Sequence, residues 1–205
     1  MAVRQPLQQM RFGCIKVRVA DAHRLKSERI APRLDARGKC AVIRLRYPVL
    51  HESNHSRINL PNEAATTAFA ARFARVLQPG LVIYLRGNLG AGKTTLVRAL
   101  LQALGYTGRV KSPTYTLVER YEVAGLNLRH FDLYRFRDAE EWESSGFRDE
   151  FDGQNICLVE WPEQATGLLP SADISITLDI LQDERELMLH AYTDAGQKCL
   201  NALPA

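Results

Sequence analysis

The chain has 205 residues, of which 46% are hydrophobic and 24% charged, a balance typical of globular proteins. No run approaches 18 consecutive apolar residues, which excludes a transmembrane helix, and 13 glycines with 9 prolines exclude a collagen-like chain. The cysteines are Cys14, Cys40, Cys157 and Cys199. Because they form no Cys-x-x-Cys pair, they argue against a zinc knuckle or a disulfide framework and favour a reducing compartment.

The N-terminal leader differs in charge from the rest of the chain. The net charge of +4 divides into +9 for residues 1–57 and −5 for residues 58–205. Its basic residues recur without helical or strand period, and only residues 43–47 alternate as a short strand does. A secretory signal is excluded because no apolar h-region follows, whereas a transit peptide stays open.

We therefore expect residues 1–57 to form a disordered extension and residues 58–200 to form one domain. Few large apolar residues are present in the leader to offset the entropy of ordering it. A nucleic-acid-binding arm is the alternative interpretation, because basic tails neutralise phosphates.

From Leu60 onward the pattern is that of an α/β protein. In chain order, we expect a helix over 63–77 that Asn62 caps, a buried strand over 81–85 and a helix over 93–104. Further strands are expected over 116–122, 127–131, 156–160, 174–180 and 186–192, with a helix over 139–144. These elements predict a mixed, mostly parallel central sheet flanked by helices.

A glycine-rich loop between the buried strand and the next helix has the most specific pattern. It reads Gly87-Asn88-Leu89-Gly90-Ala91-Gly92-Lys93-Thr94-Thr95 and fits G-x-x-x-x-G-K-[ST]. Glycines let the backbone amides turn towards an anion, and the helix N-terminus adds positive charge. Lys93 is expected to reach the β- and γ-phosphates, and the Thr94 hydroxyl to bind Mg²⁺. The loop predicts a P-loop NTPase fold that binds a nucleoside triphosphate.

Two acidic residues are candidates to complete this site. Glu160 ends an apolar run and is the first candidate, because ligands bind beyond the carboxyl ends of parallel strands. Asp132 is the second, with Arg135 as a contact of phosphate or of Asp132. The alternative interpretation is that Glu160 is a surface residue and Asp132 a turn residue at the end of a strand. His130 is expected to be packed or hydrogen-bonded rather than catalytic.

The segment 111–116 follows the P-loop helix, where loops often sense the γ-phosphate. Ser112 and Thr114 supply hydroxyl groups there and Lys111 a charge, although an ordinary turn fits the spacing almost as well. No Asn-Lys-x-Asp guanine reader is present in the chain, which argues against a GTPase.

Four motifs between residues 60 and 192 together resemble one family, TsaE (also called YjeE). They are LRGNLGAGKTTLVRALLQALG, VKSPTYTLVERY, HFDLYR and ICLVEWPE, in the family's order and spacing. The resemblance implies a cytoplasmic ATPase that binds ATP with Mg²⁺ and hydrolyses it slowly. It implies association with the TsaD–TsaB heterodimer, which threonylcarbamoylates adenosine 37 of ANN-decoding tRNAs. Contact with tRNA would be indirect, through that complex, and no membrane is involved.

The same resemblance marks individual residues. It assigns residues 88–95 to ATP, with Thr94 also on Mg²⁺, and marks Asp132 and Glu160 as essential acids near the metal. It marks Thr114 as the nucleotide-sensing threonine, and it places Trp161 and, in the first helix, Thr66 beside the nucleotide.

Two positions depart from the family pattern, and the basic leader has no counterpart in it. Asn88 replaces a usual Asp, and Phe69-Ala70 replaces a common Leu-Gly pair. Two other functions fit the residues. One is a stand-alone kinase for a small molecule, and the other is a nucleotide-dependent interaction module whose hydrolysis is incidental.

Overall fold

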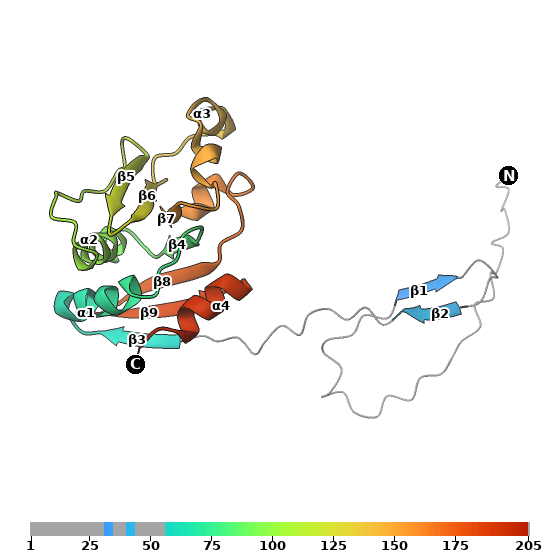
Figure 1. Cartoon of the computed structure of the whole chain (residues 1–205), viewed down its shortest axis with the longest axis horizontal. Coiled ribbons are helices and arrows are strands. Elements are labelled where there is room, and N and C mark those ends of the chain that lie inside the picture. The colour runs from blue at the N-terminus through green and yellow to red at the C-terminus, as the bar shows by residue number, and fades with distance from the viewer. Residues whose placement is uncertain (1–30, 35–39, 44–55, 205) are drawn as a thin grey trace, which may run out of the picture. The chain divides into compact units, whose positions relative to one another are not determined.

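The computed structural model describes residues 31–34, 40–43 and 56–204, and the chain divides into two compact units, residues 1–51 and 52–205. In the first unit, β1 (Ala31–Leu34) and β2 (Cys40–Ile43) pair antiparallel (Figure 1). We expected residues 1–57 to form a disordered extension, whereas the structure has these two strands within it. The rest of the predicted extension, and residues 44–47 of the strand expected there, lie outside the described residues.

The second unit is built on a seven-stranded sheet with the order β3-β9-β8-β4-β7-β6-β5 (Figure 1). Its strands are β3 (Ser56–Leu60), β4 (Val82–Arg86), β5 (Val118–Val123), β6 (Leu126–Asp132), β7 (Ile156–Glu160), β8 (Ile174–Leu181) and β9 (Glu184–Ala191). The central strands β8, β4, β7 and β6 run parallel, and the outer strands pair antiparallel. The predicted P-loop NTPase fold, with its mixed sheet, is confirmed.

The observed elements differ from the predicted ones mainly at the two ends of this unit. β3 begins at Ser56 and pairs with β9, so the last residues of the expected leader belong to the sheet. At the other end, α4 (Asp194–Asn201) was not predicted, and Thr193 caps it by accepting a hydrogen bond from the amide of Gly196. Short elements such as these depend on partners far away in the sequence, which local patterns do not show.

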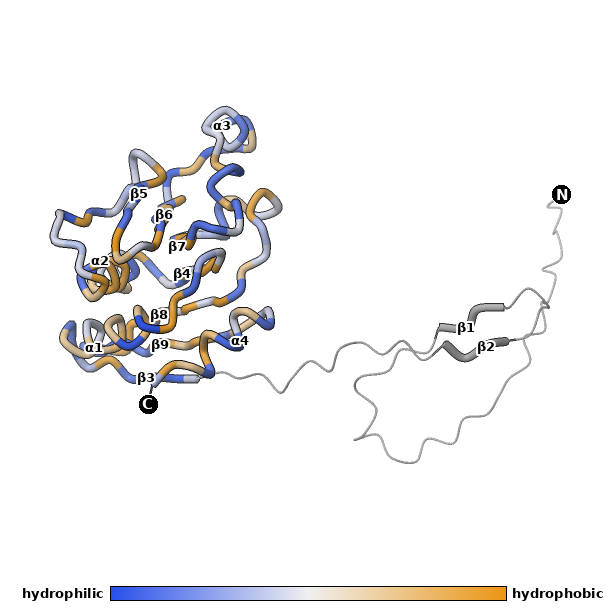
Figure 2. The backbone as a smooth tube through the Cα atoms, viewed as in Figure 1, coloured by the Kyte–Doolittle hydropathy of each residue, from blue (hydrophilic) through white to orange (hydrophobic). Residues whose placement is uncertain are grey.

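Two helices cover one face of the sheet with largely aliphatic side chains. They are α1 (Glu63–Ala74), three residues shorter than predicted, and α2 (Lys93–Ala103). The side chain of Asn62 caps α1 as expected, accepting a hydrogen bond from the amide of Ala65 at 3.0 Å. The buried faces of both helices pack on alternate residues of the parallel strands, and Figure 2 shows the hydrophobic stretches in α2 and around β4 and β8.

The opposite face is covered by aromatic side chains. α3 (Ala139–Ser144), η1 (Phe147–Glu150) and η2 (Pro162–Ala165) lie on this side. Trp142 is buried against Phe136 and Phe147, with ring centroids 6.1 and 5.5 Å away. The carboxylate of Glu150 forms ion pairs with an arginine of β5 and an arginine of β6. These contacts hold the connection from β6 to β7 against the sheet, which fixes two strands that carry the site.

Within residues 56–204 and the two short strands of the leader, no helix is both long and apolar enough to cross a membrane.

Candidate functional site

The P-loop and the two candidate acids meet because β4, β7 and β6 are adjacent parallel strands. Glu160 is the register partner of Leu85 on one side and of Asp132 on the other. The three strands therefore end at one edge of the sheet, which is where ligands bind in open α/β folds. The glycine-rich loop leaves the end of β4 at the same edge and leads directly into α2.

The backbone of the loop requires glycine. Gly87, Gly90 and Gly92 have φ angles of 130°, 79° and 106°, in the region that other residues rarely adopt. A Cβ on Gly87 would lie 2.2 Å from the carbonyl oxygen of Leu178 in β8, so the strand leaves no room for a side chain. Gly92 has no side chain to cap α2, and the first amides of the helix stay available to an anion.

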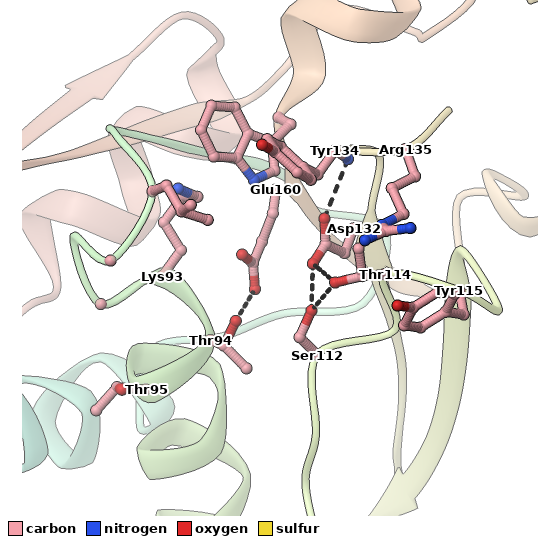
Figure 3. A pocket seen from close by; sticks show the side chains of 14 residues that line it. Lys93, Thr94, Thr95, Ser112, Thr114, Tyr115, Asp132, Tyr134, Arg135 and Glu160 are labelled. Atoms are coloured by element: carbon pink, nitrogen blue, oxygen red, sulfur yellow. Dashed lines mark hydrogen bonds between the residues drawn. The ribbon is translucent and has the colours of Figure 1, made fainter. Parts of the chain in front are cut away.

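Lys93 is buried at the base of this loop (Figure 3). Its ammonium group donates hydrogen bonds to the carbonyl oxygens of Gly87 at 2.6 Å and Asn88 at 3.0 Å. It also lies 3.9 Å from the centroid of the Trp161 ring, a cation–π contact. Burial lowers the pKa of Lys93, and neighbouring carboxylates, that of Glu160 first, oppose this shift. The ammonium group of Lys93 is therefore held against the P-loop, next to the backbone amides of that loop.

Glu160 joins the end of β7 to the P-loop helix. Its Oε1 accepts a hydrogen bond from the hydroxyl of Thr94 at 2.9 Å, and the same oxygen lies 2.8 Å from Nε2 of His130 (Figure 3 shows the contact with Thr94). In P-loop proteins a hydroxyl and a carboxylate so placed hold Mg²⁺ together. Glu160 is only 3% exposed, so it is not the surface residue of the alternative interpretation.

Asp132 joins the end of β6 to the loop that precedes β5. Its Oδ2 accepts hydrogen bonds from the hydroxyl groups of Ser112 and, at 2.8 Å, of Thr114 (Figure 3). Its Oδ1 accepts a hydrogen bond from the amide of Tyr134 at 3.1 Å. The backbone amide of Asp132 donates to the carbonyl oxygen of Leu117 at 3.0 Å, which anchors the end of this loop.

These groups line one cavity of about 640 Å³, a size within the usual range for small-molecule sites. The predicted site residues in its lining are Leu89, Gly90, Gly92, Lys93, Thr94, Thr95, Thr114, Asp132, Glu160 and Trp161. Three predicted residues lie outside the lining. Asn88 contributes its carbonyl oxygen to Lys93, Ala91 is buried beneath the loop, and Thr66 is buried in α1.

The rim of the cavity contains residues to which the sequence assigned no role. Tyr115 is 81% exposed, and the guanidinium of Arg135 lies 4.5 Å from its ring centroid. Tyr134 packs against Trp161, with ring centroids 5.0 Å apart. Arg135, for which the sequence predicts a contact with phosphate or with Asp132, lines the cavity with its guanidinium over Tyr115 and forms no ion pair with Asp132 among the described residues. Tyr115 directly follows Thr114, and Tyr134 lies two residues after Asp132. This closeness in sequence to predicted site residues could have identified both tyrosines.

The donor set fits a magnesium–nucleotide complex better than a metal held by protein alone. Among residues 56–204 and the two leader strands, no group of three or more His, Cys, Asp or Glu side chains is arranged to hold a metal ion. Mg²⁺ commonly takes one or two protein oxygens and completes its shell with phosphate and water. Thr94 and Glu160 supply protein oxygens of that kind.

Strand order and the position of the glycine-rich loop together place the second unit in the P-loop NTPase fold class. Within that class the comparisons are specific. The family model described as "Threonylcarbamoyl adenosine biosynthesis protein TsaE" matches residues 60–187. The chain therefore belongs to the TsaE family, which acts in tRNA threonylcarbamoyladenosine biosynthesis, and the resemblance seen in its motifs is confirmed.

Relatives of known sequence and structure agree with this assignment. The chain is 47% identical over 148 residues to the tRNA threonylcarbamoyladenosine biosynthesis protein TsaE of Haemophilus influenzae, covering 70% of this chain and 94% of that protein. It is 40% identical over 138 residues to the Bacillus subtilis protein of the same name, covering 67% and 84%. The crystal structure of Bacillus subtilis YdiB superposes with a TM-score of 0.62 at 31% identity, covering 75% of this chain and 96% of that one.

Proposed function

We propose that this chain binds ATP with Mg²⁺ and hydrolyses it slowly in support of a TsaD–TsaB heterodimer. In this proposal the heterodimer threonylcarbamoylates adenosine 37 of ANN-decoding tRNAs in the cytoplasm, and the chain meets tRNA only through it. The observation that supports the proposal most is the 2.9 Å contact between the hydroxyl of Thr94 and Oε1 of Glu160. It joins a P-loop hydroxyl to a carboxylate at the ligand edge of the sheet, as magnesium-dependent phosphoryl transfer requires.

Each residue of the site has a distinct task in this reaction. The backbone amides of the P-loop and the ammonium of Lys93 bind the β- and γ-phosphates. The amides carry partial positive charge, and the ammonium is held against the same loop by the carbonyl oxygens of Gly87 and Asn88. Thr94 and Glu160 hold Mg²⁺, which when bound neutralises charge on the transferring phosphoryl group. Trp161 lies over the ammonium of Lys93 in a cation–π contact and helps to hold it in place.

Asp132 has a different task because its contacts lead away from the P-loop. Ser112 and Thr114 bind its carboxylate, so the loop before β5 and the end of β6 are linked through one side chain. We assign Asp132 to positioning the attacking water, and Thr114 to sensing the γ-phosphate. A change at the γ-phosphate would then alter the loop, as in other nucleotide switches.

The rim of the cavity supports a partner that covers the nucleotide. Leu89 is 70% exposed and Tyr115 81%, both at the mouth of the cavity. Large apolar side chains gathered around a site are typical of protein interfaces, in which aromatic residues are enriched. We propose that this rim faces TsaD–TsaB.

The decisive experiment reconstitutes this chain with TsaD and TsaB. ATP binding is measured by titration, phosphate release is followed with labelled ATP, and co-elution with the heterodimer is compared with and without ATP and Mg²⁺. We expect binding, slow release of phosphate to water and nucleotide-dependent co-elution. The Lys93→Ala variant is the negative control, and Lys198→Ala, which removes an exposed lysine of α4 outside the cavity lining, is its matched control.

Other results identify other functions. Transfer of the label to a small molecule in place of water would indicate a kinase. ATP binding without turnover, even with the heterodimer, would indicate an interaction module. Failure of the wild-type protein to bind ATP would refute the proposal.

A further inference from the structure

His130 is a polar side chain buried among aliphatic ones. It lies two residues before the carboxyl end of β6, is fully buried, and pairs in register with Leu158 of β7. Leu128 lies two residues before it on the same strand and is also fully buried. Nε2 of its ring lies 2.8 Å from Oε1 of Glu160, and Nδ1 has no hydrogen-bond partner within the described part of the chain.

We assign the ring hydrogen to Nε2 because that nitrogen faces Oε1 of Glu160 at 2.8 Å, and a carboxylate oxygen is a hydrogen-bond acceptor. In the neutral ring, Nδ1 is then an acceptor without a donor, which is unfavourable inside a protein. Leu128 and Leu158, which flank His130 on this face of the sheet, are aliphatic, so a leucine at this position would avoid that penalty. Packing against these two leucines therefore gives no reason for histidine here.

We infer that His130 is a positioning residue for Glu160. Its Nε2–H holds Oε1 in the orientation in which that oxygen meets the hydroxyl of Thr94. Oε2 is left without a hydrogen bond from any described residue, while Glu160 lines the cavity. Thr94 is itself a proposed metal ligand, whereas His130 is too deeply buried to bind the metal. The imidazole therefore acts only by orienting the carboxylate of Glu160. This inference rests on the proposed function for its consequence, which is tighter binding of the divalent cation.

The test compares two substitutions of the same residue. His130→Leu removes the donor and keeps an apolar side chain, whereas His130→Gln retains an amide donor in place of Nε2. Affinity for Mn²⁺, a paramagnetic probe, is measured by electron paramagnetic resonance in the presence of ADP. Residues that support metal ligands typically change metal affinity about 10–100-fold. We expect His130→Leu to weaken Mn²⁺ binding about 10-fold and His130→Gln to restore it to within about 3-fold of the wild type.

A double-mutant cycle shows whether His130 acts through Glu160. In a Glu160→Ala background, His130→Leu should cause no further loss of Mn²⁺ affinity, because the carboxylate that it orients is gone. ADP affinity in EDTA should be unchanged by His130→Leu. An unchanged Mn²⁺ affinity in folded His130→Leu, or an equal loss in the Glu160→Ala background, would overturn the inference.

A spectroscopic measurement tests the inference without nucleotide or metal. In the wild-type protein, the ¹⁵N spectrum of the imidazole should show a hydrogen on Nε2 that exchanges slowly with solvent, because the donor is buried against Glu160. An imidazole with its hydrogen on Nδ1 and none on Nε2 would overturn the inference even if His130→Leu fails to fold. If the wild-type protein binds no ATP, the proposed function fails, while this tautomer still decides whether His130 supports Glu160.

Discussion

The two sides of the cavity hold their carboxylates in different ways. On the P-loop side, Glu160 is bound by the hydroxyl of Thr94 and by a buried imidazole. On the other side, Asp132 is bound by two hydroxyl groups of a loop and by a backbone amide. Both acids are 3% exposed and they are partners in register. Equal burial and adjacency therefore do not imply equal tasks, and the different partners of the two carboxylates are the basis for proposing metal binding for Glu160 and a separate task for Asp132.

The largest expected effect comes from Glu160→Gln, which keeps the shape of the side chain and removes its charge. Turnover should fall about 100- to 1,000-fold, the range seen when a group that stabilises developing charge is lost. Mn²⁺ affinity in the ADP complex should also fall, while ATP still binds through the P-loop amides. Single-turnover hydrolysis of labelled ATP measures the first effect. Wild-type turnover would remove Glu160 from the site and leave Asp132 as the metal-linked acid.

Asp132→Asn should also stop most turnover, by about 100-fold, because it disturbs the positioning of water rather than the metal. Mn²⁺ affinity should stay within about 3-fold of the wild type, since the Thr94–Glu160 pair is intact. The test is therefore the difference in Mn²⁺ affinity between Asp132→Asn and Glu160→Gln. Equal losses of metal affinity in Glu160→Gln and Asp132→Asn would show that the two sides share one task.

Lys93→Ala tests the cation on the P-loop side. Hydrogen bonds to charged groups contribute roughly 1.5–3 kcal/mol, so ATP affinity should fall about 10–100-fold. The parallel substitution Lys198→Ala should leave affinity nearly unchanged, because that lysine is exposed on α4 and lies outside the cavity lining. Calorimetric titration with ATP gives both values. Unchanged affinity in a folded Lys93→Ala protein would contradict the assignment of the P-loop.

Thr114→Val should have a smaller effect, because Asp132 keeps its hydrogen bonds from Ser112 and from the amide of Tyr134. One hydrogen bond contributes about 0.5–1.5 kcal/mol, which corresponds to a fall in turnover of about 3- to 10-fold. Thr114→Ser retains the hydroxyl group and should restore turnover. Steady-state phosphate release compares the two variants with the wild type, and wild-type turnover in Thr114→Val would show that the hydroxyl group of Thr114 takes no part in the chemistry.

Removal of the leader should have the smallest effect. Both sides of the cavity lie within residues 52–205, which form one compact unit. A protein that begins at Glu52 should therefore fold and keep its ATP affinity within about 2-fold. Thermal unfolding and ATP titration check this expectation. Loss of folding or of nucleotide binding would show that residues 1–51 contribute to the domain.

Much of the fold was predictable because its signals are local. The apolar run of β7, the glycines of the P-loop and the cap at Asn62 each act within a few residues. β3 was missed because its residues are mostly exposed, and it exists through pairing with β9 about 130 positions later. The end of α1 was placed three residues too late, since the apolar pattern continues beyond Ala74 while the helix does not.

Local patterns alone established the P-loop, the two candidate acids and the family to which the chain belongs. They left open which acid meets Thr94, and they gave no place to Tyr115 or Tyr134. Only the tertiary structure showed Glu160 bonded to Thr94, 66 positions away, and to His130, 30 positions away. The physical reason is that strand order and register, through hydrogen bonds between distant segments, decide which side chains meet at the edge of the sheet.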